Sequence, residues 1–96
     1  MARFTIRIVL HDASWDDYIT MYKHLAVYGI ADTITSDNGT VYELPPAEYN
    51  YEGDATAQQV QETARQCAAK VAASYAVLVT EATARTWIGL NVVKRS

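Results

Sequence analysis

The sequence has 96 residues, of which half are hydrophobic and a fifth are charged, with a formal net charge of −3 at pH 7. This length and composition fit one compact domain and exclude a disordered chain. The acidic excess removes any general attraction to nucleic acid, so a contact with nucleic acid has to be local. No apolar run approaches the roughly 20 residues of a membrane span, and the amino terminus lacks a secretory hydrophobic segment, so we expect a cytoplasmic protein without membrane contact.

The first predicted element is a strand over residues 3–10, because apolar residues alternate with others along it. We expect it to be the central strand of a small sheet, with one face buried. The predicted buried face consists of Phe4, Ile6, Ile8 and Leu10. The strand ends in two polar residues that can take part in chemistry, His11 and Asp12.

Two capping boxes predict where the helices begin. Ser14 with Asp17 starts a helix over 15–28, which Gly29 ends, and Thr56 with Gln59 starts a helix over 57–72. The predicted apolar face of the first helix is Trp15, Ile19, Tyr22 and Leu25 or Ala26. That of the second is Val60, Ala64, Cys67, Ala68 and Val71. Cys67, the single cysteine, is therefore interpreted as a core residue rather than a reactive thiol.

The remaining strands are predicted from short extended runs between turn signals. Residues 30–35 and 40–44 flank the turn 36–39 and form a hairpin. Pro45 and Pro46 then force a jog before a strand over 47–52, because neither can donate a backbone hydrogen bond. The apolar run 74–80 is predicted to be a well-buried strand, and 85–93 an edge strand before the basic end at Lys94 and Arg95.

This order of elements predicts an α+β domain over 1–96, a ferredoxin-like split βαβ two-layer sandwich with an added C-terminal edge strand. Such a fold leaves one sheet face without helices. If Ile6 and Ile8 face the helices, the alternation places Arg3, Thr5 and Arg7 on the other face, beside Glu48, Asn50 and Glu52. The predicted core consists of Ile6, Ile8, Leu10, Ile19, Leu25, Ile34, Val60, Ala64, Val77 and Val79.

The predicted charges on the uncovered face have two explanations. Opposite charges on neighbouring strands stabilise pairing by about 0.2–1 kcal/mol each. Alternatively, this face is an interaction surface for a second copy of the chain or for RNA, with arginine contacting phosphate. The same alternation buries Tyr49 and Tyr51, which argues against base stacking on the sheet. We expect a homodimer, formed through this face and an edge strand at 87–93.

His11, Asp12, Asp16 and Asp17 are predicted to lie at one end of the sheet, where they could form a metal site or a general acid-base pair. Asp16 and Asp17 have a structural explanation, since negative charge in a first helical turn is stabilised by about 0.3–1 kcal/mol. No capping argument explains His11 and Asp12. The sequence contains no phosphate-binding loop, nucleophile elbow or paired-cysteine metal motif.

The element order also resembles that of a known family. The resemblance rests on the segments Phe4-Thr-Ile-Arg-Ile, Asp32-Thr-Ile-Thr with Asp37-Asn-Gly, and Asp54-Ala-Thr-Ala, and on the helix ending near Leu25. Over residues 3–80 the chain resembles the GhoS-like antitoxins of type V toxin–antitoxin systems. The resemblance implies an endoribonuclease that cleaves the toxin's messenger RNA, on a scaffold similar to the Cas2 nucleases. Those nucleases carry an aspartate at the end of their first strand, where Asp12 stands here.

Cleavage of RNA needs proton transfer to and from oxygen, and positive charge at the phosphate. We assign proton transfer to His11, orientation of His11 or binding of a divalent metal ion to Asp12, and phosphate contact to Arg7 or Lys23. The sequence identifies no cofactor. The alternative is a non-catalytic acidic binding protein or inhibitor, of the kind that phages and mobile elements encode, which blocks a basic site on a protein partner.

Overall fold

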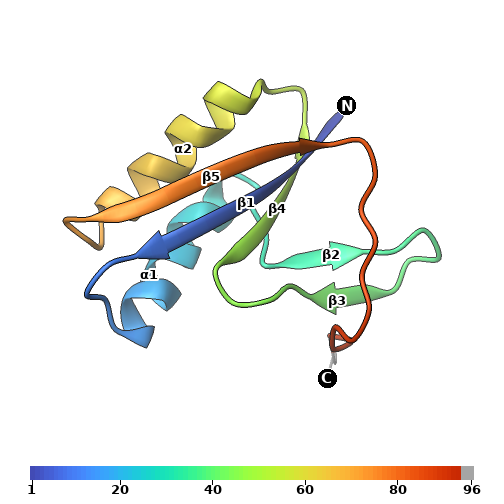
Figure 1. Cartoon of the computed structure of the whole chain (residues 1–96), viewed down its shortest axis with the longest axis horizontal. Coiled ribbons are helices and arrows are strands. Elements are labelled where there is room, and N and C mark those ends of the chain that lie inside the picture. The colour runs from blue at the N-terminus through green and yellow to red at the C-terminus, as the bar shows by residue number, and fades with distance from the viewer. Residues whose placement is uncertain (94–96) are drawn as a thin grey trace.

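The computed structural model describes residues 1–93 and shows a mixed α+β fold with a three-stranded and a two-stranded antiparallel sheet (Figure 1). In chain order, the elements are β1 (Ala2–Leu10), α1 (Trp15–Val27), β2 (Thr33–Thr35), β3 (Val41–Glu43), β4 (Glu48–Gly53), α2 (Ala57–Ala69) and β5 (Tyr75–Ala82). The larger sheet has the order β4-β1-β5, and both helices lie on one of its faces. Neither of the helices within residues 1–93 is long and apolar enough to cross a membrane.

The prediction that the first strand is central is confirmed. β1 pairs with β4 on one side and with β5 on the other, both antiparallel. Phe4, Ile6 and Ile8 are completely buried beneath the helices, because alternate side chains of a strand point to the same face. Residues from both helices, from β1 and β4 and from the segment after α1 complete this core: Leu10, Met21, Leu25, Ile30, Tyr49, Val60, Ala64, Cys67 and Ala68.

The register of β1 with β4 also agrees with the sequence prediction. Arg3 lies opposite Glu52, Thr5 opposite Asn50, and Arg7 opposite Glu48. Tyr49 faces the core and is only 5 % exposed. The uncovered face of the sheet therefore carries the polar residues of both strands.

Both predicted capping boxes are present. The Ser14 hydroxyl accepts from the Asp17 backbone N–H at 3.3 Å, and the Asp17 carboxylate accepts from the Ser14 N–H at 3.0 Å. Thr56 and Gln59 make the equivalent pair at 3.1 and 2.9 Å. Gly29 follows α1 with a φ of +78°, a left-handed conformation that glycine adopts without steric cost.

The predicted hairpin is present but shorter than expected, and it forms a separate sheet. β2 pairs only with β3, and a single bridge between Ala31 and Asn50 connects the start of the hairpin to β4. The prolines that follow β3 lead into Ala47, which has a φ of +67° and whose carbonyl accepts from the Ile8 N–H at 2.9 Å. This is the predicted jog before β4.

The orientation of α1 differs from the prediction at Ile19, which is 42 % exposed rather than in the core. Met21 and Leu25 are the buried residues of this helix, and Tyr18 and Tyr22 pack beside them. The buried stripe is thus rotated relative to the predicted one. Trp15, also predicted on the buried face, is 71 % exposed.

The strand predicted to be well buried, 74–80, is instead an outer strand of the sheet. Tyr75, Val77 and Val79 of β5 are half-buried against the core, whereas Leu78 is 63 % exposed. The physical reason is that the helices cover only one face of β5 and that β1 pairs with only one of its edges. Val77 and Val79 therefore lie at the margin of the core.

The predicted edge strand over 85–93 is present only as a single antiparallel bridge between Tyr42 of β3 and Val92, and β5 is the last full strand of residues 1–93. This segment runs beside β3 (Figure 1), where the Glu43 N–H donates to the Asn91 carbonyl at 2.8 Å and the Val93 N–H donates to the Val41 carbonyl at 2.9 Å. A left-handed Gly89, with φ +81°, interrupts the extended backbone. Lys94 and Arg95 lie outside the described residues.

Candidate functional site

The turn after β1 holds His11 in a defined position. Its backbone N–H donates to the Ser74 carbonyl at 3.0 Å, and its ring Nδ1 lies 2.8 Å from the Ser74 hydroxyl. Ser74 directly precedes β5, so the loop between α2 and β5 orients the imidazole. With Nδ1 engaged, Nε2 is the nitrogen left for proton transfer from an exposed ring.

Asp12 is exposed and has a φ of +53°, in the left-handed region that aspartate adopts more readily than most residues. The end of β1, two residues before Asp12, is held by Tyr18 of α1, whose hydroxyl accepts from the Leu10 backbone N–H at 2.8 Å. His11 and Asp12, to which the sequence assigns the chemistry, are therefore neighbours on a turn that Tyr18 of α1 and Ser74 before β5 hold in place.

The structure does not gather the acidic residues of this end into a metal site. Asp17 is occupied by the capping box of α1. Within residues 1–93, no three His, Cys, Asp or Glu side chains are placed so that they could hold a metal ion. Asp12 could supply one ligand to a divalent ion, and the other oxygens would have to come from water and a phosphate.

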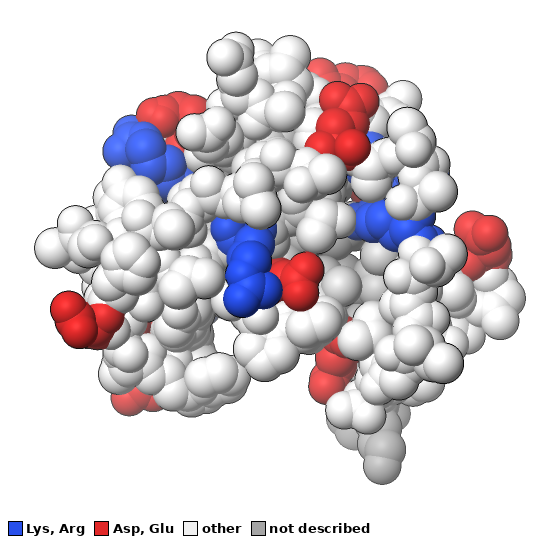
Figure 2. Space-filling view, viewed as in Figure 1, with Lys and Arg blue, Asp and Glu red and all other residues white. Residues whose placement is uncertain are grey.

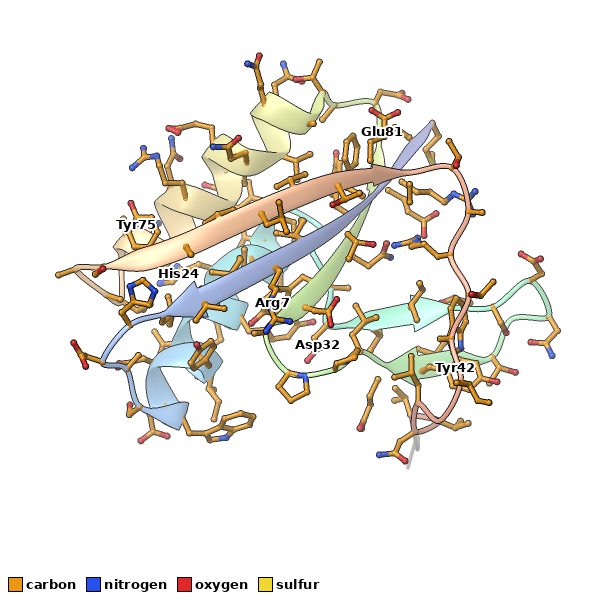
Figure 3. All side chains as sticks on the ribbon, viewed as in Figure 1. Arg7, His24, Asp32, Tyr42, Tyr75 and Glu81 are labelled. Carbon is orange, nitrogen blue, oxygen red and sulfur yellow. The ribbon has the colours of Figure 1, made fainter. Side chains whose placement is uncertain are left out.

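The two predicted phosphate-binding residues lie on different faces of the molecule. Arg7 is exposed on the uncovered face of the sheet, where Figure 3 shows its side chain in front of β1, and its Nη1 is 3.8 Å from a Glu48 carboxylate oxygen. Lys23 is exposed on α1, which packs against the opposite face. One phosphate cannot therefore contact both.

The uncovered face also holds Arg85, an arginine for which no sequence pattern indicates a role. Arg85 Nη1 donates to Asn50 Oδ1 at 2.6 Å, and its Nη2 is 3.7 Å from a Glu52 carboxylate oxygen. The Arg85 side chain is only 14 % exposed, and its Nε is buried without a hydrogen-bond partner. Burial lowers the pKa of this guanidinium, and Glu52 partly opposes that effect.

Arg85 also borders a polar cavity of about 560 Å³ between the uncovered face and the β2–β3 turn. Its charged lining residues are Arg3, Arg85, Asp37 and Glu52, so two cations are balanced by two carboxylates. Figure 2 shows that the charges on this side of the molecule are few and of both signs. No continuous basic surface for a nucleic acid is visible in this view.

A second region missed from the sequence is a cleft of about 730 Å³ on the α1 side of the hairpin. Residues of α1, the Pro45–Pro46 turn and segment 89–93 line it. Its aromatic residues are Trp15, Tyr18, Tyr22 and Tyr49, and its acidic residues are Asp32, Glu43 and Glu48. The described lining residues include no lysine or arginine. We call this region the acidic aromatic cleft.

The contacts that create these two regions were not readable from local patterns. Arg85 reaches hydrogen-bond partners that lie 35 to 81 positions away in the chain. The acidic aromatic cleft depends on how α1 is rotated, and its acidic residues Asp32, Glu43 and Glu48 come from other segments, so no local pattern of the sequence indicates it. Comparison of the sequence with protein-family models and with curated proteins finds no match.

Proposed function

We propose that this chain is a GhoS-like antitoxin with a ferredoxin-like fold, a small cytoplasmic endoribonuclease that cleaves the messenger RNA of a toxin. The strand order β4-β1-β5 supports the fold. In a ferredoxin-like sheet the strand after the first helix occupies the outer position beside β4, and the Ala31–Asn50 bridge brings the start of the hairpin to that position.

The observation that carries the activity is the placement of His11, whose ring is held by Ser74 at 2.8 Å next to Asp12. In the proposed reaction, His11 Nε2 removes a proton from the attacking hydroxyl or protonates the leaving oxygen. Asp12 stabilises the protonated imidazole or supplies one oxygen to a divalent ion. Arg7 contacts the RNA phosphate on the uncovered face, and Lys23 can do so only from the helical side.

Substitution of the two assigned residues tests this function. His11→Ala and Asp12→Ala should each lower RNA cleavage by about 100-fold or more, the usual scale for a general acid-base group. Both side chains are exposed, so His11→Ala should melt close to the parent, whereas Asp12→Ala should melt lower but still cooperatively, because alanine is strained at a φ of +53°. His24→Ala, at the other histidine, is the matched control and should cleave normally. Full activity in both variants would refute the site, and a parent inactive with and without magnesium would refute the endoribonuclease.

We further propose that the antitoxin is a homodimer joined through the edge of β5 that pairs with no other strand of residues 1–93, and through the adjoining uncovered face. The exposed edge presents Tyr-Ala-Val-Leu-Val without proline or lysine, which are the residues that usually protect such edges. An antiparallel two-fold pairing centred on Leu78 would place Val77 opposite Val79 of the second copy. Light scattering should therefore give twice 10.7 kDa, and Leu78→Lys should give the monomer. A 10.7 kDa parent at micromolar concentration would contradict the dimer.

The second candidate function is a non-catalytic binding protein that blocks a basic site on another protein. The acidic aromatic cleft favours it, because three carboxylates gather there without a described basic residue. An RNA-degradation gel run beside a pull-down with purified basic proteins separates the two functions. Intact RNA together with retention of a basic protein would select the binding protein.

A further inference from the structure

The acidic aromatic cleft has the chemistry of a site for an organic cation. We propose that it binds a lysine or arginine side chain presented by a basic, partly apolar segment of a partner protein. This inference deepens the second candidate function by naming the site and the chemistry of the partner. It does not depend on whether the chain cleaves RNA.

The walls of the cleft are aromatic. Tyr22 and Tyr49 stack with their ring centroids 6.3 Å apart and their planes at 14°. Trp15 stands on the first turn of α1 and Tyr18 follows one turn later, so Trp15, Tyr18 and Tyr22 line one side of the cleft. Tyr49, which is only 5 % exposed, closes its floor. The face of an aromatic ring attracts a lysine ammonium or an arginine guanidinium, and groups of such rings bind quaternary ammonium ligands in other proteins.

The charged side chains among the described lining residues of the cleft are all acidic. Asp32, Glu43 and Glu48 line it, and although Glu48 also faces Arg7, Asp32 and Glu43 have no described salt-bridge partner. Burial together with the Asp32 carboxylate raises the pKa of Tyr22. Burial, Tyr18 and Asp32 raise the pKa of Tyr49 to about 12. Burial opposes a charge of either sign, whereas the Asp32 carboxylate opposes a negative phenolate, attracts a positive charge and repels the phosphates of RNA.

The rim of the cleft indicates that the cation belongs to a protein segment rather than to a free small molecule. Trp15 and Ile19 are 71 % and 42 % exposed, although both are large apolar side chains. Pro45 and Pro46 add further apolar surface on the opposite side. The cleft volume of about 730 Å³ is larger than that of a single basic side chain, so neighbouring apolar residues of the partner segment would cover this rim.

A defined peptide tests the inference on the full chain. The probe is an eight-residue peptide in which lysine and leucine alternate, and the matched control peptide has glutamine in place of lysine. Binding is measured by calorimetry, and the site is mapped by amide chemical-shift changes. We expect the lysine peptide alone to bind, with shifts in the first turn of α1 and around Asp32 and Glu43, and with weaker binding at high salt.

Variants then assign the binding to the cleft. Asp32→Asn and the exposed Glu43→Gln should each weaken binding about tenfold, and Trp15→Ala should weaken it similarly, because each removes a direct contact with the cation or its segment. Glu81→Gln makes the same change in net charge at the end of β5, away from Asp32 (Figure 3), and should bind as the parent does. Thermal melts should show that each variant is folded.

Three results would overturn the inference: equal binding of the glutamine peptide, unchanged binding in all three cleft variants, or shifts confined to the uncovered face of the sheet. The same variants keep the inference separate from RNA cleavage. Asp32→Asn should retain any cleavage activity of the parent, whereas His11→Ala should retain peptide binding. Loss of one property therefore does not imply loss of the other.

Discussion

Replacement of Arg85 by methionine tests how much the buried guanidinium contributes to stability. Methionine keeps most of the length and apolar surface of the side chain and removes the charge and all donors. The variant loses the 2.6 Å hydrogen bond to Asn50 and weaker contacts at 3.4 Å to the Phe4 carbonyl and the Thr5 hydroxyl. It also loses the 3.7 Å ion pair with Glu52, which is 41 % exposed and can be hydrated instead.

The two main contributions have opposite signs. A hydrogen bond to a charged group contributes about 1.5–3 kcal/mol, and the two weaker contacts add about 1 kcal/mol together. Against this, the variant no longer buries a guanidinium whose Nε lacks a partner, a defect that costs about 1–3 kcal/mol. The ion pair is partly exposed and contributes little. The net expectation is a loss of about 1–2 kcal/mol in the free energy of unfolding.

Urea denaturation followed by circular dichroism measures this difference. For a chain of this size, a loss of about 1–2 kcal/mol lowers the urea midpoint by about 1 M with an unchanged slope. Arg7→Met is the control, since Arg7 is exposed and 3.8 Å from Glu48, and its midpoint should move by less than about 0.3 M. An Arg85→Met variant as stable as the parent would refute the reasoning, because the burial cost would then equal or exceed the contribution of the Asn50 contact.

Two further predictions concern the core. Ile8→Asp should abolish cooperative thermal unfolding, because it places an unpaired carboxylate at a completely buried position. The control Ile19→Asp, at a partly exposed position, should still melt cooperatively. Equal melting of Ile8→Asp and the parent would contradict the central role of β1. The pKa of the Tyr49 phenol is about 12 in the folded protein and about 10 in the unfolded chain, so the folded state holds this proton more tightly. The resulting contribution to the free energy of unfolding is complete below pH 10, and about 2–3 kcal/mol of it should be lost as the pH rises from 10 to 12. Urea midpoints across this range should fall more steeply in the parent than in Tyr49→Phe, and identical slopes would count against the assignment.

The sequence by itself determined the features that depend on short-range spacing. Both capping boxes join residues three positions apart, so Ser14 with Asp17 and Thr56 with Gln59 could be identified without tertiary information. The alternation in β1 fixed which face is buried, because a strand turns every second side chain to the same side. The same parity placed Arg7 opposite Glu48.

Only the tertiary structure decided which surfaces were left uncovered. An apolar run has the same composition in a central strand and in an outer one, so Leu78 could not be recognised as exposed until the neighbours of β5 were known. The rotation of α1 is set by its packing on the core, which left Trp15 and Ile19 at the acidic aromatic cleft. Arg85 is buried by partners on distant strands, because segment 85–93 follows the hairpin instead of the main sheet. These positions depend on long-range contacts, and local patterns carry no information about them.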